Sequence, residues 1–332
     1  MQPMNARSYI NRKWLNFIQS LMIISAMSLI LALLGWLIAG STGVVWAFVT
    51  GAAVLIISSR LSTWPMLLRL YKARLLRPEQ APVLYQNMQV LSRRAGLGND
   101  PALFYIPSLS VNAFSMGDRK SPVIALTDGL LRTLNLRELR AVMAHEISHI
   151  RNNDLTIMNI ADVVSRMTAI LALGGQILLF INLPLILMEG YHISWWIIIT
   201  LILAPTISTV MQLALSRTRE FDADTDAAML TQDPQGLAMA LAKLEYTSPG
   251  WLSGVFMPGK KTDLPSILRT HPRSKDRIDR LLSLAQDSGH EHISGQGTEY
   301  LVLPASISKP GPARKNRFRG MWFLNIILWS DR

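Results

Sequence analysis

The sequence predicts an α+β membrane protein. About four transmembrane helices, arranged as two hairpins, accompany a mainly helical polar part with a small sheet. The 332 residues are 50% hydrophobic and only 17% charged, with a mean hydropathy of +0.26, which is too apolar for an ordinary soluble domain of this length. The apolar residues gather in runs long enough for membrane spans, and shorter strand-like and helix-like patterns lie between them.

The charge balance and the absence of cysteine narrow the chemistry. Lys and Arg number 33 against 22 Asp and Glu, a net charge of +11. Beside apolar spans, such a basic surplus indicates contact with anionic lipid headgroups in the bilayer. No nucleic-acid-binding motif occurs, so we expect no nucleic-acid partner. With no Cys in the chain, disulfides and thiolate zinc sites are excluded, and a transition metal would need His, Asp or Glu.

The first predicted transmembrane hairpin covers residues 17–59, after a polar N-terminus of residues 1–16. Its first arm, Phe17–Ala39, is long enough to cross a hydrocarbon core of ~30 Å. A four-residue loop containing two glycines leads to the second arm, Val44–Ser58. That arm is short for a span, but the long side chain of Arg60 can extend it towards the headgroups.

The first polar part, residues 60–162, carries the predicted sheet. Helical periodicity covers residues 78–96, with a proline near its start. Short apolar runs bounded by Pro, Asp and Gly predict strands at Ala102–Ile106 and Val123–Leu126, and a weaker strand at Val111–Ser115. Asn135 then stands where an N-cap for the next helix is expected.

The second predicted hairpin covers residues 163–215, with arms at Met167–Met188 and Ile193–Leu215. The short loops inside both hairpins carry no Lys or Arg, whereas the polar parts are basic. The positive-inside rule therefore predicts that the termini and both polar parts are cytoplasmic.

The second polar part, residues 216–289, is predicted to be helical. Asp233 caps a helix that has Pro234 at its first position, and a further helix is expected over residues 272–286. The tail, residues 290–332, is predicted to be a flexible linker ending in an apolar segment too short to span, which suits an interfacial anchor or a segment folded back into a groove.

The motif His145-Glu146-Ile-Ser-His149 lies inside a run with helical character. Residues four apart share a helix face, so both histidines can direct their imidazoles at one metal ion. Glu146 lies about 100° around the helix, where it can reach a metal-bound water without being a ligand. The bland alternative is two surface histidines on an amphipathic helix.

The segment Glu220-Phe-Asp-Ala-Asp224 offers a third ligand. Catalytic zinc sites use three protein ligands and keep one position for water, so Glu220 would complete a His-His-Glu site for one Zn²⁺ per chain. Asp224, on the same helix face, would accept a hydrogen bond from the far nitrogen of a ligand histidine. The interval from His149 to Glu220 is filled almost wholly by the second hairpin. The alternative is a solvated face on which both acids pair with Arg217 and Arg219.

These motifs occur together with Asn112-Ala-Phe, and with Thr270-His-Pro272 before Asp276-Arg-Ile-Asp-Arg-Leu281. In this order they resemble the HtpX-type membrane zinc metallopeptidases over about residues 10–285. The resemblance implies a gluzincin-like zinc peptidase domain, mainly helical with a small sheet. The wider family includes the CAAX prenyl endopeptidase, which has more spans, so four predicted spans favour the HtpX type.

The resemblance also implies roles for individual residues. Zinc held by His145, His149 and Glu220 would lower the pKa of its water, and Glu146 would take the proton and later protonate the leaving amine. His271, by its position in the Thr-His-Pro element, is the candidate donor to the oxyanion.

The resemblance implies that substrate pairs as an extended strand with the Val111–Ser115 segment, which would place Asn112 and Ala113 in the binding site. It also implies that the substrates are misfolded membrane proteins or other unfolded polypeptides, cut on the cytoplasmic side of a plasma membrane such as the bacterial inner membrane as part of membrane protein quality control. Plainer roles are a helix cap for His271 and a turn residue for Asn112.

Two other functions remain open for the whole chain: a non-catalytic membrane adaptor that binds zinc for structure, and a CAAX-type endopeptidase. A structural zinc site is usually closed by four protein ligands, and Glu146 would then have no purpose. A transporter is disfavoured because the predicted spans contain no acidic residue.

Overall fold

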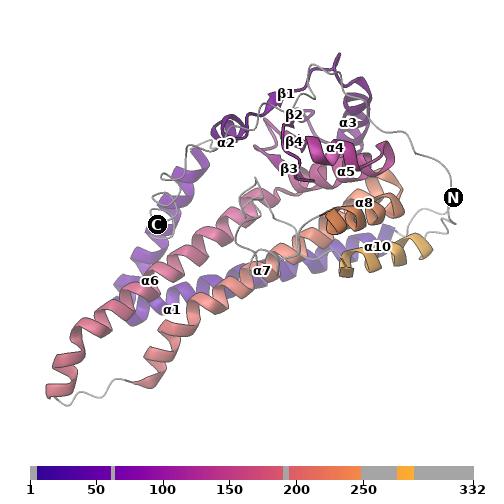
Figure 1. Cartoon of the computed structure of the whole chain (residues 1–332). Helices are drawn as coiled ribbons and strands as arrows, with labels where there is room; N and C mark the ends of the chain where they lie inside the picture. The colour runs from indigo at the N-terminus through magenta and orange to yellow at the C-terminus, as the bar shows by residue number, and fades with distance from the viewer. Residues whose placement is uncertain (1–5, 61–63, 190–193, 248–274, 288–332) are drawn as a thin grey trace. The chain divides into compact units, whose positions relative to one another are not determined.

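The computed structural model describes residues 6–60, 64–189, 194–247 and 275–287 (Figure 1). Its elements, in chain order, are α1 (Ala6–Arg60), α2 (Trp64–Leu70), β1 (Arg74–Leu75), α3 (Pro82–Ala95), β2 (Ala102–Ile106), β3 (Ala113–Met116), β4 (Val123–Thr127), α4 (Asp128–Thr133), α5 (Leu136–Asn152), α6 (Asp154–Glu189), α7 (Trp195–Thr231), α8 (Pro234–Thr247) and α10 (Lys275–Asp287).

The described chain divides into two compact units. The membrane unit comprises residues 17–60, 156–189 and 194–216. The polar unit comprises residues 6–16, 64–155, 217–247 and 275–287.

Three helices of the described chain are long and apolar enough to cross a membrane: Lys13–Ser58 within α1, Asp154–Pro184 within α6, and Trp195–Thr231, which is α7. This confirms a membrane protein. The predicted loop of the first hairpin falls inside α1, where Ala39 and Gly40 leave the helical conformation. Because two predicted spans are joined in one bent helix, the count of four crossings stays a prediction.

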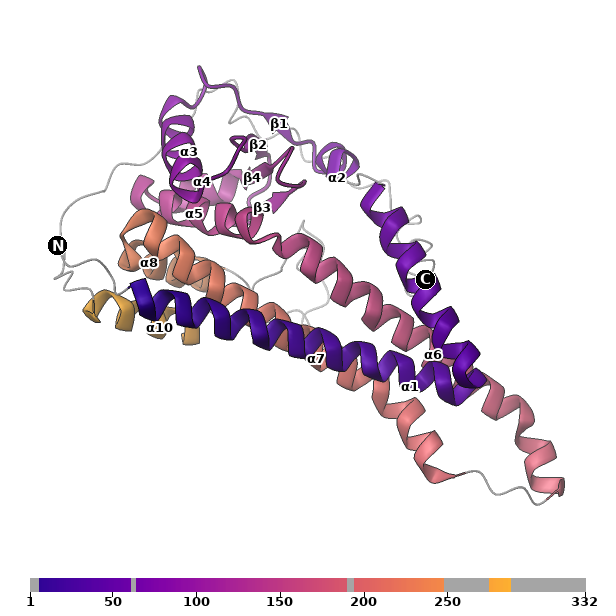
Figure 2. The same cartoon turned by 180° about the vertical axis from the view of Figure 1, so that it is seen from behind.

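Glycine makes the bend in α1 possible. Gly40 has a φ of 61°, in the left-handed region that favours glycine. On either side of it, the backbones of Gly35 and Gly43 meet: a Cβ on Gly35 would lie 2.8 Å from the carbonyl oxygen of Gly43, and a Cβ on Gly43 would overlap that of Gly35. The chain therefore turns back on itself at this point (Figure 2).

Small and aliphatic side chains join the long helices of the membrane unit. One buried cluster consists of Leu34 of α1, Ala172 of α6, and Leu201 and Ala204 of α7. The amide Nε2 of Gln176 donates to the carbonyl oxygen of Leu201 at 2.9 Å. Small residues and satisfied polar groups at helix interfaces are what a bilayer environment requires.

The polar unit contains a four-stranded mixed sheet in the order β1-β2-β4-β3. β2 and β4 are parallel, while β1 and β3 run antiparallel to their neighbours. β1 and β3 are thus the edge strands, and α5 packs beside β3. This contact brings the helix with the His-Glu-x-x-His motif to the sheet edge.

Alternate strand residues enter two different cores, as the two-residue period of a strand requires. Leu103 of β2 and Ile124 of β4 face the larger core, which is shared with α3, α5, α8 and α10. Ile106 and Ala125 face the smaller core, which α2 covers through Leu68.

Several predicted elements are confirmed with shifted ends. The strand at residues 102–106 agrees with prediction, and the strand predicted at residues 123–126 extends to residue 127, whereas β3 begins two residues after Val111. α3 begins at Pro82 rather than residue 78, because residues 77–80 form a turn in which Gln80 N donates to the carbonyl oxygen of Arg77 at 2.9 Å. α2, α4 and β1 were not predicted.

Candidate metal centre

The helix α5 has strong boundary signals at both ends. At its start, the side chain of Asn135 accepts from Glu138 N, and Asn135 N donates to Glu138 Oε2, both at 2.9 Å, forming the predicted cap as a full capping box. At its end, Asn153 adopts a left-handed conformation with φ 60° and donates to the carbonyl oxygens of His149 and Ile150. These signals fix the length of the helix that carries the motif.

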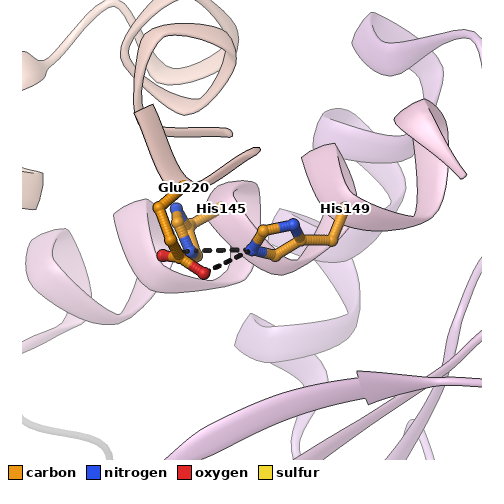
Figure 3. A group of neighbouring side chains, drawn as sticks. All are labelled: His145, His149 and Glu220. Atoms are coloured by element: carbon orange, nitrogen blue, oxygen red, sulfur yellow. Dashed lines mark hydrogen bonds and ion pairs between the residues drawn. The ribbon is translucent and has the colours of Figure 1, made fainter. Parts of the chain in front are cut away.

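Three side chains converge at this helix: His145 and His149 from α5, and Glu220 from α7 (Figure 3). The two Nε2 atoms lie 3.1 Å apart. A Glu220 oxygen lies 3.4 Å from Nε2 of His145, and the other lies 3.7 Å from Nε2 of His149. All three side chains are buried.

These separations fit one metal ion. In a tetrahedral zinc site, N and O ligands at about 2.0–2.2 Å from the metal lie roughly 3.3–3.6 Å from each other. The separations of 3.1, 3.4 and 3.7 Å fall close to that range. The sequence prediction that these three side chains meet is therefore supported by geometry; their role as ligands belongs to the proposal below.

Each histidine has a carboxylate behind it. Nδ1 of His145 lies 3.1 Å from Oδ1 of Asp224, and Nδ1 of His149 lies 2.7 Å from Oδ2 of Asp154. A histidine that donates its Nδ1 proton to a carboxylate presents the lone pair of Nε2. Both lone pairs then point to the same place. Asp224 occupies its predicted position, whereas Asp154, the first residue of α6, was not predicted.

Each of these carboxylates has an arginine behind it. Arg277 of α10 donates to both oxygens of Asp224, at 2.6 and 2.7 Å, and forms an ion pair with Glu220 at 2.9 Å. Its exposed fraction is only 2%. Arg219 donates from Nε to Asp154 at 2.7 Å. The alternative of a solvated face, on which Glu220 and Asp224 pair with Arg217 and Arg219, is wrong for Arg219. This arginine pairs with Asp154 and Asp222 instead.

The carboxylates raise the pKa of both histidines in the metal-free protein. For His145, burial alone would lower the pKa, but Asp224 and Glu220 outweigh burial and raise it to about 10. Burial likewise opposes, and Asp154 drives, a raised pKa for His149.

The electrostatics favour a cation. The buried carboxylates of Glu146, Glu220, Asp224 and Asp154 outnumber the two buried arginines around the centre. A divalent ion that displaced the imidazole protons would neutralise this excess charge.

The remaining predicted residues have different outcomes. Glu146 follows His145 in α5, is buried, and lies close enough to Arg277 for their charges to interact. Asn112 precedes β3, and its backbone is tied to Thr127: Thr127 Oγ1 donates to the carbonyl oxygen at 2.8 Å and accepts from Asn112 N at 3.0 Å. Ala113 is the first residue of the edge strand. His271 lies outside the described residues.

The comparisons with known proteins agree with the site. The model of "Peptidase family M48" matches residues 78–285. The chain is 36% identical to the protease HtpX homologue of Acaryochloris marina, over 75% of this chain and 88% of that protein. It is 34% identical to the homologue of Pyrococcus furiosus, over 77% of this chain and 91% of that protein. The chain belongs to peptidase family M48.

A solved structure, S. mikatae Ste24p, shares 20% identity and a TM-score of 0.42, covering 82% of this chain and 66% of that one, a likeness too weak to carry an argument. The family and the HtpX relatives confirm the resemblance drawn from the motifs. This M48 protein is therefore a metalloendopeptidase with membrane-spanning helices.

Proposed function

We propose that this M48 protein is a zinc-dependent endopeptidase that cuts misfolded membrane proteins and other unfolded polypeptides at the cytoplasmic face of the plasma membrane, as part of membrane protein quality control. The observation that carries the proposal is the convergence of three buried donor atoms from His145, His149 and Glu220. The cytoplasmic side rests on the basic polar parts and the positive-inside rule.

The proposed roles follow from the positions of the side chains. Zinc bound by the three donors would act as a Lewis acid and lower the pKa of a water molecule towards ~7. His145 and His149 present Nε2 to the metal, because their Nδ1 atoms face the carboxylates of Asp224 and Asp154. The carboxylate of Glu146 accepts the proton of the attacking water and passes it to the leaving amine.

We assign substrate binding to the edge strand β3. Its outer edge has no strand partner among the described residues, and α5 packs beside it. An extended polypeptide can therefore add to the sheet by backbone hydrogen bonds, next to the centre. Ala113 is the first residue of this strand and Asn112 precedes it. Their role in substrate binding rests on the resemblance. The oxyanion role of His271 rests on the resemblance alone.

The test uses zinc content and cleavage of an unfolded polypeptide, measured on the full chain in lipid nanodiscs. Wild type should hold one zinc per chain and cut; Glu146→Gln should keep zinc and be inert; Glu220→Ala should lose zinc. Retention of both zinc and activity in Glu220→Ala would disprove the third ligand. Unchanged cleavage by Glu146→Gln would disprove the general base, and a wild type without zinc or cleavage would disprove the function.

A further inference from the structure

One stretch of α7 carries four acidic residues at alternate positions: Glu220, Asp222, Asp224 and Asp226. Residues four apart share a helix face, and residues two apart lie on nearly opposite faces. Glu220 and Asp224 face the metal centre. Asp222 and Asp226 therefore face away from it, yet both are buried. Buried carboxylates need partners, so something must cover this second face.

The first turns of α1 cover it. Nζ of Lys13 lies 3.2 Å from Oδ2 of Asp226, and Nδ2 of Asn16 donates to Oδ1 of Asp222 at 3.0 Å. Figure 2 shows this end of α1 running along α7. The same helix continues directly into the first candidate span.

From Asn16, a chain of hydrogen bonds and ion pairs leads to a proposed metal ligand. Oδ1 of Asp222 accepts the hydrogen bond from Asn16, and Oδ2 of Asp222 lies 3.2 Å from Nη2 of Arg219. Nε of Arg219 donates to Oδ1 of Asp154 at 2.7 Å. The other oxygen of Asp154 meets Nδ1 of His149, also at 2.7 Å. Arg219 is thus shared between two carboxylates, of which one is satisfied by Asn16 and the other orients the histidine.

A second route runs from Lys13 to the same helix end. Asp226 forms an ion pair with Lys13 and also accepts a hydrogen bond from Nδ2 of Asn152 at 2.8 Å. Asn152 is the last residue of α5, three positions after His149. Both routes therefore end at the last turn of the helix that carries the motif.

We propose that Asn16 and Lys13, at the entrance of the first membrane helix, are positioning residues for His149. The inference rests on the proposed function, since it treats His149 as a zinc ligand. Without Asn16, Asp222 would keep Arg219 as its remaining partner in the chain of contacts and draw it away from Asp154. His149 would then lose its fixed ring orientation, although neither α1 residue touches the centre.

The experiment measures zinc release to a chelator, together with kcat and KM on an unfolded polypeptide, for the full chain in lipid nanodiscs. Asn16→Ala should release zinc about 3- to 10-fold faster, less than the ~10–100-fold expected for a group bonded directly to a ligand histidine. kcat should fall and KM should stay constant. Gln19→Ala is the matched control: an exposed amide on the same helix, which should match wild type.

Two further variants keep the inference testable if Asn16→Ala folds poorly. Asn16→Asp places a carboxylate against Asp222 and should release zinc faster still. Its combination with Asp222→Asn restores a donor and an acceptor and should bring the release rate back towards that of wild type.

Zinc release and kcat at wild-type values in Asn16→Ala and Asn16→Asp would overturn the inference while leaving the proposed function intact. Equal effects of Gln19→Ala would also overturn it, because the cause would then be general loosening of α1. A wild type that binds no zinc would overturn the proposed function and the inference together.

Discussion

The two histidines of the centre are held by the same sequence of groups, a carboxylate and then an arginine, but the two supports differ in what lies behind them. Behind His145, Asp224 meets Arg277, which also contacts Glu220. Behind His149, Asp154 meets Arg219, which also contacts Asp222 and so connects to α1. The groups behind His145 therefore lead back to the proposed ligand Glu220, whereas the groups behind His149 lead away from the metal centre to α1.

The difference predicts different consequences of damage. On the His145 side, a single guanidinium compensates two carboxylates, one of them a proposed ligand. On the His149 side, the charge of Arg219 is shared with residues that do not touch the metal site. The His145 side should therefore be the more sensitive to substitution.

The largest effect is expected for Arg277→Met. Removing the guanidinium takes away one partner of the buried ion pairs with Asp224 and Glu220, a change that typically costs about 3–5 kcal/mol. We expect a fall of that size in the unfolding free energy of the metal-free protein, measured by chemical denaturation. Lys275→Met, on an exposed position of the same helix, is the control and should change it little. Equal stability of the two variants would contradict the compensating role of Arg277.

An effect of intermediate size is expected on zinc affinity when the carboxylate of Asp154 or Asp224 is removed. Asp154→Ala and Asp224→Ala should each weaken zinc binding about 10–100-fold, measured by competition with a chelator. Asp224→Ala should be the weaker binder, because Arg277 then keeps only Glu220 in this group and competes with the metal for it. In Asp154→Ala, Arg219 keeps Asp222 instead. The reverse order would show that the two supports do not differ as described.

The raised pKa of His145 also predicts a pH dependence of the metal-free protein. The pKa of His145 is raised from 6.5 to about 10. A raised pKa in the folded state stabilises the protein fully below pH 6.5, and this contribution is lost as the pH rises towards 10. Tm of the metal-free protein should therefore fall from pH 6.5 to 10, and the dependence should flatten in Asp224→Ala. A Tm that rises over this interval would contradict the raised pKa.

The parts of the site that the sequence could predict lie on single helices. The spacing of His145 and His149, and that of Glu220 and Asp224, places each pair on one face without knowledge of the rest of the fold. Asp154 could not be found this way, because it follows a helix break at Asn153 and reaches His149 across that break. Its signal was an acidic residue directly after the motif helix.

Arg277 was missed for a different reason. It lay in a motif used for the family resemblance, but nothing local shows that α10 packs against α7. The buried contact between Arg277 and Asp224 spans 53 positions in sequence.

In the fold, too, features set by local sequence could be predicted, and features set by contacts between distant segments could not. Strands bounded by Pro, Asp and Gly were found at the right residues, since these breakers act locally. The bend in α1 fell at the predicted loop, but its tightness depends on the contact between Gly35 and Gly43, which is tertiary. The two-residue strand β1 exists only through its pairing with β2 and has no pattern of its own.

α6 and α7 are each one uninterrupted helix, and each carries both a residue of the metal centre and a candidate span. This limits where the length of the chain can change between members of the family. α6 begins at Asp154, and α7 ends eleven residues after Glu220, so the helices that carry site residues are the same ones that provide candidate spans. Turns added to both helices at their far ends would change the hydrophobic length without altering the register of the donors. The interval between His149 and Glu220 can therefore adapt to bilayers of different thickness, while the four-residue spacings inside each motif cannot vary.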